Sequence, residues 1–238
     1  MIVDLFIPCF VDQFYPETGL NIIKILKKLG IEYHYNPKQT CCGQPAFNSG
    51  YAKDALIMAK KFVSDFPHDR FILTPSASCA GYIRNHYKGL SKSPDFQIQA
   101  ERLERNVVEL TDFLVNKIGV LDFQSQFKGK VTWHSACSAL REYKLKDEAQ
   151  KLLSYVKDLE LIPLHDNEVC CGFGGTFMLK FSSISEAMVE QKVEAALETG
   201  AEYILSTECS CLLNIESYII KNKLPIKPLH IADVLACF

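Results

Sequence analysis

Cysteine is the residue type in this sequence that could do chemistry most readily. The chain of 238 residues has ten cysteines, and nine of them form two similar sets. The first set is Cys9, Cys41, Cys42 and Cys79, and the second is Cys137, Cys170, Cys171, Cys209 and Cys211. In each set a single cysteine precedes an adjacent pair by 32 or 33 residues, and the last members follow the pair by 37 to 40 residues. Clustered thiolates bind metals, hold iron–sulfur clusters or exchange with disulfides, so the pattern predicts one of these chemistries.

The sequence around the cysteines is also repeated. Residues 71–79 align with residues 203–211, and residues 108–114 align with residues 229–235. Landmarks in the same order at nearly constant offsets indicate an internal duplication. We therefore predict two tandem halves, residues 1–118 and residues 128–238, with a linker at residues 119–127.

The last cysteine of the second half can be aligned in two ways. The repeated strand text pairs Cys79 with Cys211 and places Ala77 opposite Cys209, whereas counting from the adjacent pair favours Cys209 slightly. Both cysteines therefore stay candidate ligands, and the second half has one more candidate ligand than the first.

Each half alternates between strand-like and helix-like segments. Short runs rich in β-branched residues predict strands, and apolar residues at helical spacing predict helices. The predicted strands are residues 2–7, 31–35, 70–74, 130–133, 160–164, 202–206 and 226–230. The predicted helices are residues 17–29, 51–66, 80–87, 144–157, 185–198, 212–221 and 232–236. This order predicts an α/β fold of two quasi-symmetric repeats, each a parallel sheet flanked by helices. The charged segment 91–106 has no counterpart and is the best candidate for an insertion or linker.

Each cysteine of the two sets is predicted to lie between the end of a strand and the start of a helix. Such turns share one edge of a parallel sheet, where ligands usually bind, so the cysteines of each half should converge there. Nearby helix N-termini stabilise thiolates and anionic sulfides. Four thiolates in one half suffice for a cubane iron–sulfur cluster or a tetrahedral zinc ion. Glycines after each pair allow close backbone approach and positive φ, and the predicted cofactor-binding glycines are Gly43, Gly172, Gly174 and Gly175.

Simpler explanations exist for the same residues. Free cysteine is commonly a core residue, and an adjacent pair could form a vicinal disulfide, but duplication at matching turns favours metal binding. Cys237 has no counterpart in the first half and is predicted to be a core residue. His134 and Arg141, which flank Cys137, are weak candidates for catalysis; a packed histidine and a surface arginine are the alternatives.

The composition argues against several classes of protein. Hydrophobic residues make up 48% of the chain and charged residues 23%, which is typical of an ordered globular protein. A formal net charge of −2 supplies no basic surface for nucleic acid or an anionic membrane. The N-terminal segment lacks the features of a signal peptide, and no apolar stretch is long enough to span a membrane. We therefore expect a cytoplasmic protein whose thiols stay reduced.

The pattern Cys…Cys-Cys-Gly…Cys, present twice, resembles a known cysteine-rich domain. It is similar to the CCG domain found in heterodisulfide reductases, in the iron–sulfur component of glycolate oxidase and in related iron–sulfur oxidoreductases. A chain of two such domains, with Ile7-Pro-Cys-Phe-Val-Asp12 near its start and Cys170-Cys-Gly-Phe-Gly-Gly-Thr-Phe177 in its second half, is most similar to the lactate-utilisation protein A group. The resemblance covers nearly the whole chain.

The resemblance implies an iron–sulfur electron-transfer subunit of an L-lactate oxidising complex. The implied cofactor is an iron–sulfur cluster of the 4Fe–4S type, with zinc as the alternative in one half. The implied partners are a ferredoxin-like iron–sulfur subunit and a third small subunit. The sequence departs from the heterodisulfide reductase pattern, because Cys79 has no second cysteine three residues later and the second half has Cys209-Ser-Cys211. Five-ligand non-cubane clusters are therefore not expected in the first half.

Two other functions fit the same cysteines. One is a zinc-stabilised module that assembles the complex without carrying electrons. The other is a metal-free thiol–disulfide oxidoreductase that uses the adjacent pairs.

Overall fold

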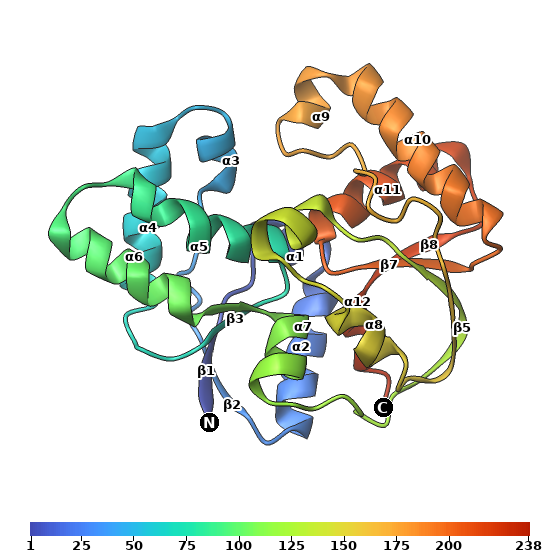
Figure 1. Cartoon of the computed structure of the whole chain (residues 1–238), viewed down its shortest axis with the longest axis horizontal. Coiled ribbons are helices and arrows are strands. Elements are labelled where there is room, and N and C mark those ends of the chain that lie inside the picture. Colours follow the sequence, from blue (N-terminus) through green and yellow to red (C-terminus); the bar gives the residue numbers. More distant parts are fainter.

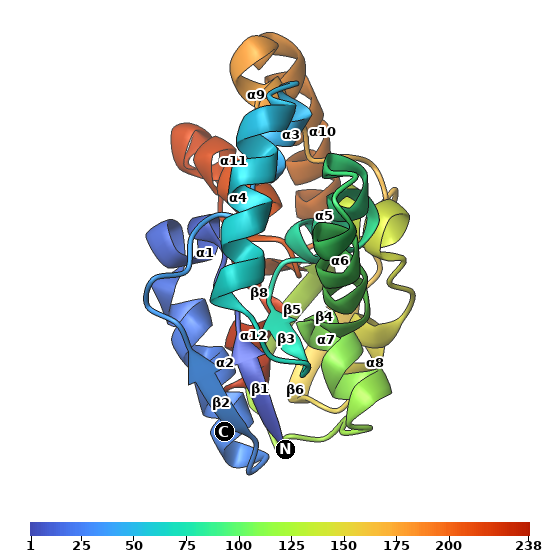
Figure 2. The same cartoon turned by 90° about the vertical axis from the view of Figure 1, so that its left-hand side faces the viewer.

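Two four-stranded parallel sheets form the framework of the protein, seen in a computed structural model that describes all residues from 1 to 238 (Figures 1 and 2). The first sheet has the order β2-β1-β3-β4 and the second β6-β5-β7-β8, and all neighbouring strands are parallel. The strands of the first sheet are β1 (Ile2–Leu5), β2 (Glu32–Tyr35), β3 (Ile72–Thr74) and β4 (Val107–Glu109). Those of the second are β5 (Gln126–Trp133), β6 (Lys157–Ile162), β7 (Tyr203–Ser206) and β8 (Lys227–His230). The same strand order in both sheets confirms the predicted α/β fold of two quasi-symmetric repeats.

Helices connect the strands in both halves. The first half contains α1 (Cys9–Phe14), α2 (Pro16–Lys28), α3 (Gln44–Asn48), α4 (Ala52–Asp65), α5 (Ala77–Leu90), α6 (Pro94–Asn106), α7 (Leu110–Asp112) and a π-helical turn at Phe113–Lys117. The second half contains a π-helical turn at Ala139–Tyr143, then α8 (Glu148–Leu153), α9 (Phe177–Lys180), α10 (Ser182–Glu198), α11 (Cys209–Asn222) and α12 (Ile231–Leu235). No helix combines the length and the apolar content that crossing a bilayer would require.

The helix α2 shows how the sequence specifies these elements. Its first residue is Pro16, which lacks the N–H that a first turn leaves unpaired anyway. Glu17 lies in the first turn and two lysines in the last, which complements the helix dipole. Ile22, Ile25 and Leu26 lie on one face and are fully buried. Propensity, charge and amphipathicity therefore agree along this helix.

Several predicted segments differ from the structure. The segment 91–106 is an insertion without a counterpart, but most of it forms the regular helix α6, which packs on α5 and buries Phe96 and Leu103. The helix predicted over residues 144–157 begins later, because Lys144 has a left-handed φ of 70° that ends the preceding π-helical turn, and it already ends at Leu153. Strand β6 accordingly starts at Lys157, three residues before the predicted strand.

The hydrophobic core does not divide between the two halves. One buried cluster joins Phe6, Phe62 and Tyr87 of the first half to Val189 and Ile215 of the second. The other cluster likewise combines buried side chains from both sheets. Figure 1 shows the first half (blue to green) beside the second (yellow to red), with α2 in contact with α12 where they meet. Each half therefore buries much of its apolar surface against the other.

Candidate functional site

Four cysteines of the first half come together at the carboxyl edge of the first sheet. Cys9 begins α1, the adjacent pair lies in the loop between β2 and α3, and Cys79 lies in the first turn of α5. Sulfur–sulfur interactions connect Cys9 to Cys41 and Cys41 to Cys42, and the Sγ atoms of Cys42 and Cys79 are 3.4 Å apart. We call these four residues the first thiol set.

The second half repeats this arrangement. Cys137 follows β5, Cys170 and Cys171 lie in the loop before α9, and Cys211 lies in the first turn of α11. Interactions between sulfurs connect Cys137 to Cys170, Cys170 to Cys171 and Cys171 to Cys211. These four residues are the second thiol set, and Cys211 is thus the spatial counterpart of Cys79.

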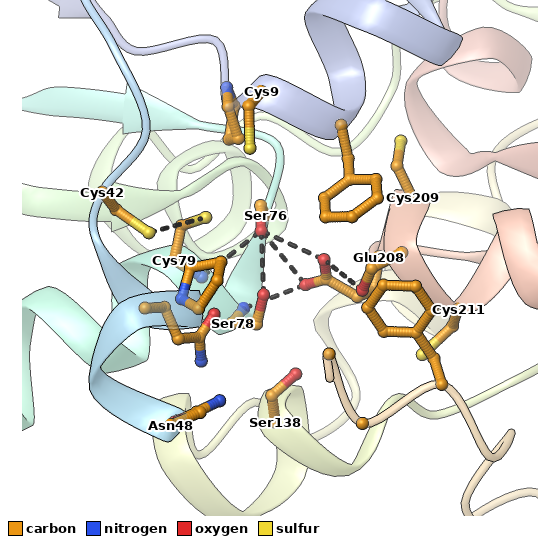
Figure 3. A pocket seen from close by; sticks show the side chains of 18 of the residues that line it. Cys9, Cys42, Asn48, Ser76, Ser78, Cys79, Ser138, Glu208, Cys209 and Cys211 are labelled. Atoms are coloured by element: carbon orange, nitrogen blue, oxygen red, sulfur yellow. Dashed lines mark hydrogen bonds between the residues drawn. The ribbon is translucent and has the colours of Figure 1, made fainter. Parts of the chain in front are cut away.

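Cys209 has a different position from the second thiol set. It is the first residue of α11, as Ala77 is the first residue of α5. Its side chain is buried, and Figure 3 shows it on the opposite side of Glu208 from Cys211. Burial is the main effect that raises the pKa of its thiol. Cys237 lies outside both sets, and its Sγ donates to the carbonyl oxygen of Asp233 at 3.2 Å.

Backbone N–H groups stabilise one sulfur in each set. The amide nitrogens of Gly43 and Gly172 both donate to the Sγ two residues earlier, at 3.4 Å in each half. Both glycines have left-handed φ values, +91° and +85°. A Cβ on Gly43 would lie 2.9 Å from Cβ of Met58, and one on Gly172 would lie 2.6 Å from the carbonyl oxygen of Ser185. Glycine is therefore required for the loop to reach the sulfur and to pack on α4 in the first half and on α10 in the second.

The thiols of each set share negative charge unevenly. Hydrogen bonds from Cys42 and Cys9 lower the pKa of Cys41, and hydrogen bonds from Cys137 and Cys171 lower that of Cys170. The same contacts raise the pKa values of the neighbouring thiols. Each set thus favours one thiolate flanked by thiols, and further thiolates require a compensating positive charge, which a bound metal supplies.

Both thiol sets face one cavity between the halves. The cavity offers about 190 Å³ of space that water can enter, and all nine cysteines of the repeated pattern line it. Phe10 of the first half and Phe173 of the second also line it, and their rings pack edge to face with centroids 5.3 Å apart. Glu208 is the only charged residue among the lining side chains. The repeat predicts one separate site in each half, whereas in the structure both thiol sets line the same cavity.

Glu208 and three serines form a hydrogen-bonded group between the two thiol sets (Figure 3). The Ser76 hydroxyl donates to both carboxylate oxygens at 3.1 and 3.2 Å, and the Ser78 amide donates at 2.9 Å. The Ser210 hydroxyl donates at 3.1 Å. Burial raises the pKa of Glu208, and these hydrogen bonds oppose the change. This group was not predicted, although the spacing Ser-x-Ser-Cys in one half and Glu-x-Ser-Cys in the other was available as a signal.

The remaining predicted site residues lie in different surroundings. Gly174 and Gly175 line the cavity beside Phe173. His134 is completely buried outside the cavity lining, and one of its ring nitrogens lies within 4.8 Å of the sulfurs of Cys171 and Cys211. Burial, together with the charge of Lys192, lowers the pKa of His134 to about 3. Arg141 is exposed and does not line the cavity.

The donor atoms fit a thiophilic metal or an iron–sulfur cluster. Each set presents four sulfurs from three segments, and the second cysteine of each pair is almost fully buried. All of these cysteines are free thiols. Soft sulfur donors held by loops and helix N-termini, with N–H groups directed at the sulfur, are the ligands that zinc and iron–sulfur clusters use.

Comparison with known proteins identifies the two halves. The cysteine-rich domain named CCG matches residues 3–84 and residues 131–216, and each match contains one complete thiol set. Lactate utilization protein A of Bacillus pumilus (strain SAFR-032) is 42% identical over 235 residues, which cover 99% of both chains. The chain belongs to the CCG-domain family of lactate utilization protein A.

Other relatives of this CCG protein agree in length. Lactate utilization protein A 1 of Bacillus mycoides (strain KBAB4) is 43% identical over 236 residues, covering 99% of this chain and 96% of the relative.

Among solved structures, a hypothetical protein from Helicobacter pylori is similar with a TM-score of 0.64 and 10% identity. That match covers 98% of this CCG protein and 48% of the other chain, and it shows a common fold alone.

Proposed function

We propose that this CCG protein acts in L-lactate utilisation as an electron-transfer subunit, with one iron–sulfur centre held by each thiol set. The observation that carries the proposal is the pair of matching thiol sets that face one cavity. Relatives that share about two fifths of the sequence over the whole chain are named for lactate utilisation, which supports the choice of pathway.

The proposed ligands are the members of the two sets. Cys9, Cys41, Cys42 and Cys79 would hold the first centre, and Cys137, Cys170, Cys171 and Cys211 the second. When bound, an iron–sulfur centre supplies transfer of single electrons. Cys209 lines the same cavity outside the second set and is proposed as a neighbour of the centres rather than as the fourth ligand.

The protein's own residues would stabilise and shield these centres. Gly43 and Gly172 donate their N–H groups to ligand sulfurs, which stabilises negative charge there. The edge-to-face contact between Phe10 and Phe173 would restrict water on one wall of the cavity. Because Phe10 belongs to the first half and Phe173 to the second, this wall depends on the packing of both halves.

The resemblance to lactate-oxidising systems also supports two proposed partners, a ferredoxin-like iron–sulfur subunit and a third small subunit. Electrons from lactate would pass between these subunits and the centres of this protein. The reducing cytoplasm, where exposed thiols survive, is the proposed location.

A structural zinc site in the second half is the second candidate. One ring nitrogen of His134 and the sulfurs of Cys171 and Cys211 lie within 4.8 Å of one another, a spacing that a single ion can bridge. In that case the protein would assemble its partners without carrying electrons through this half.

Growth on L-lactate and visible absorption together test the proposal. A strain that lacks the gene would be complemented with wild-type protein, with Cys42→Ser and with Cys237→Ser as the matched control. We expect growth with wild type and the control, no growth with Cys42→Ser, and a brown protein bleached by dithionite after anaerobic purification. A colourless, zinc-containing protein that still supports growth would favour the assembly role. Growth with Cys42→Ser equal to wild type would overturn the proposal.

A further inference from the structure

The surroundings of the two thiol sets differ at one pair of equivalent positions. Phe6 and His134 each lie three residues before the first cysteine of their set. Their backbone amides donate to equivalent carbonyl oxygens, Phe6 to Leu73 at 2.9 Å and His134 to Leu205 at 2.8 Å. Both side chains are completely buried. The same buried position, three residues before the first cysteine of the set, is therefore occupied by a phenyl ring in one half and by an imidazole in the other.

A second replacement accompanies the first. Gly43 packs on Met58, and Gly172 packs on Met188. These matching contacts align α4 with α10, so Phe62 and Lys192 occupy equivalent positions in the two halves. In the first half, Phe62 packs edge to face on Phe6 with ring centroids 4.9 Å apart. In the second half, Lys192 is buried, and its Nζ donates to the carbonyl oxygen of Asp166 at 2.6 Å. An aromatic pair in one half thus corresponds to two basic side chains in the other.

His134 lacks the contacts that would explain a buried imidazole as a packing residue. Neither ring nitrogen has a well-formed hydrogen bond. One of them lies within 4.8 Å of the sulfurs of both Cys171 and Cys211. A buried polar side chain without partners is destabilising unless another group satisfies it, and phenylalanine at the equivalent position shows that the fold accepts an apolar ring there.

We propose that His134 is a nitrogen ligand of the metal centre held by the second thiol set, where it joins Cys171 and Cys211 and replaces one of the other two thiols, Cys137 or Cys170, among the four ligands. The two halves then have different donor sets: sulfur alone in the first, and sulfur with one imidazole nitrogen in the second. This inference rests on the proposed metal binding at the thiol sets, but it holds for zinc as well as for an iron–sulfur centre. Replacing a thiolate ligand with an imidazole raises the reduction potential of an iron–sulfur centre. The second centre would therefore be the more easily reduced of the two.

Cadmium-113 NMR tests the donor sets directly. Metal-free protein labelled with ¹⁵N-histidine would be titrated with ¹¹³Cd²⁺ without oxygen. Nitrogen in place of sulfur moves the cadmium resonance to lower chemical shift, and a bound imidazole couples to the metal. We expect two resonances, of which one lies at lower shift and is coupled to ¹⁵N. In His134→Phe, which copies the first half, this coupling is lost and the affinity of the second set for Cd²⁺ falls about tenfold or more. His165→Phe, at an exposed histidine, is the matched control and leaves both resonances unchanged.

Each possible outcome decides a separate claim. Two resonances of all-sulfur type, without coupling to histidine nitrogen in the wild-type protein, would overturn the role of His134 and leave metal binding intact. Because the coupling is measured in wild-type protein, this result does not depend on folding of the variant. Absence of Cd²⁺ binding at both sets would overturn the metal centres of the proposed function, and the inference with them.

Discussion

Ser76 and Glu208 occupy equivalent positions in the two halves and hydrogen-bond to each other across the boundary, at 3.1 and 3.2 Å. Each is the residue immediately before the helix that carries the last cysteine of its set. Glu208 also accepts from the amide of Ser78, in the first turn of α5. The helix N-termini that position Cys79 and Cys211 are therefore tied together, so the spacing of the two thiol sets depends on this contact.

Substituting Glu208 by alanine should destabilise the protein. The change leaves the buried Ser76 hydroxyl and the Ser78 amide without their acceptor, which costs about 1–3 kcal/mol. Urea denaturation of the metal-free protein measures the loss. Glu216→Ala is the control, because Glu216 also accepts across the boundary, from Tyr15, but is less buried. An equal loss in both variants would show that the position of Glu208 has no special importance.

The two candidate cysteines of α11 should behave differently. Cys211 belongs to the second thiol set, whereas Cys209 lies apart from it, so Cys211→Ser should lose the metal of the second set and Cys209→Ser should keep it. Metal content per chain after anaerobic purification is the measurement. The prediction fails if Cys209→Ser loses as much metal as Cys211→Ser.

Gly172 should tolerate alanine less well than Gly175. Both have left-handed φ values, which disfavour alanine by about 1–2 kcal/mol. A Cβ on Gly172 would also lie 2.6 Å from the carbonyl oxygen of Ser185, whereas one on Gly175 meets no atom within 4 Å. We expect losses in the free energy of unfolding of about 2–5 kcal/mol for Gly172→Ala and about 1–2 kcal/mol for Gly175→Ala. Similar losses would indicate that the loop moves freely away from α10.

Glu109 should make stability depend on pH. Its carboxyl is fully buried at the end of β4, and burial raises its pKa to about 8 although Thr111 and Asp112 donate to it. A carboxyl with a raised pKa in the folded state favours folding when protonated. Its contribution is therefore complete below about pH 4.5 and is lost as the pH rises through 8.

The variant Glu109→Gln removes this titration. Urea denaturation at several pH values between 5 and 9 should show that the variant gains stability relative to wild type as the pH rises. Thr111→Ser, which keeps the hydroxyl and the amide near Glu109, is the control and should follow the wild-type pH profile. A constant difference between Glu109→Gln and wild type across this range would mean that Glu109 does not titrate there.

The sequence was sufficient to predict that the cysteines within each half converge. Repeated spacing located both thiol sets, and the rule that strand ends of a parallel sheet share one edge predicted that residues as distant as Cys9 and Cys79 would converge. The sequence did not allow the prediction that both thiol sets face the same cavity. This arrangement depends on packing between the halves, for example of Phe10 on Phe173, and contacts between the two halves leave no periodic signal in the sequence.

Local backbone geometry explains one error in the predicted elements, and an apolar face hidden by charge explains another. Lys144 adopts a left-handed conformation that apolar spacing does not reveal, so the predicted helix over residues 144–157 was too long. The charged segment before Val107 forms a helix because one face carries Phe96, Ala100 and Leu103, which are buried against the first half. High charge on the other face concealed this pattern.

The content of iron, acid-labile sulfide and zinc per chain tests the central claim most directly. The measurement compares anaerobically purified wild-type protein with Cys42→Ser, Cys171→Ser and the double variant. We predict iron and sulfide in matching amounts in wild type, about half in each single variant and almost none in the double variant. Wild-type protein without bound metal, or a double variant with as much iron as wild type, would contradict the assignment of one centre to each thiol set.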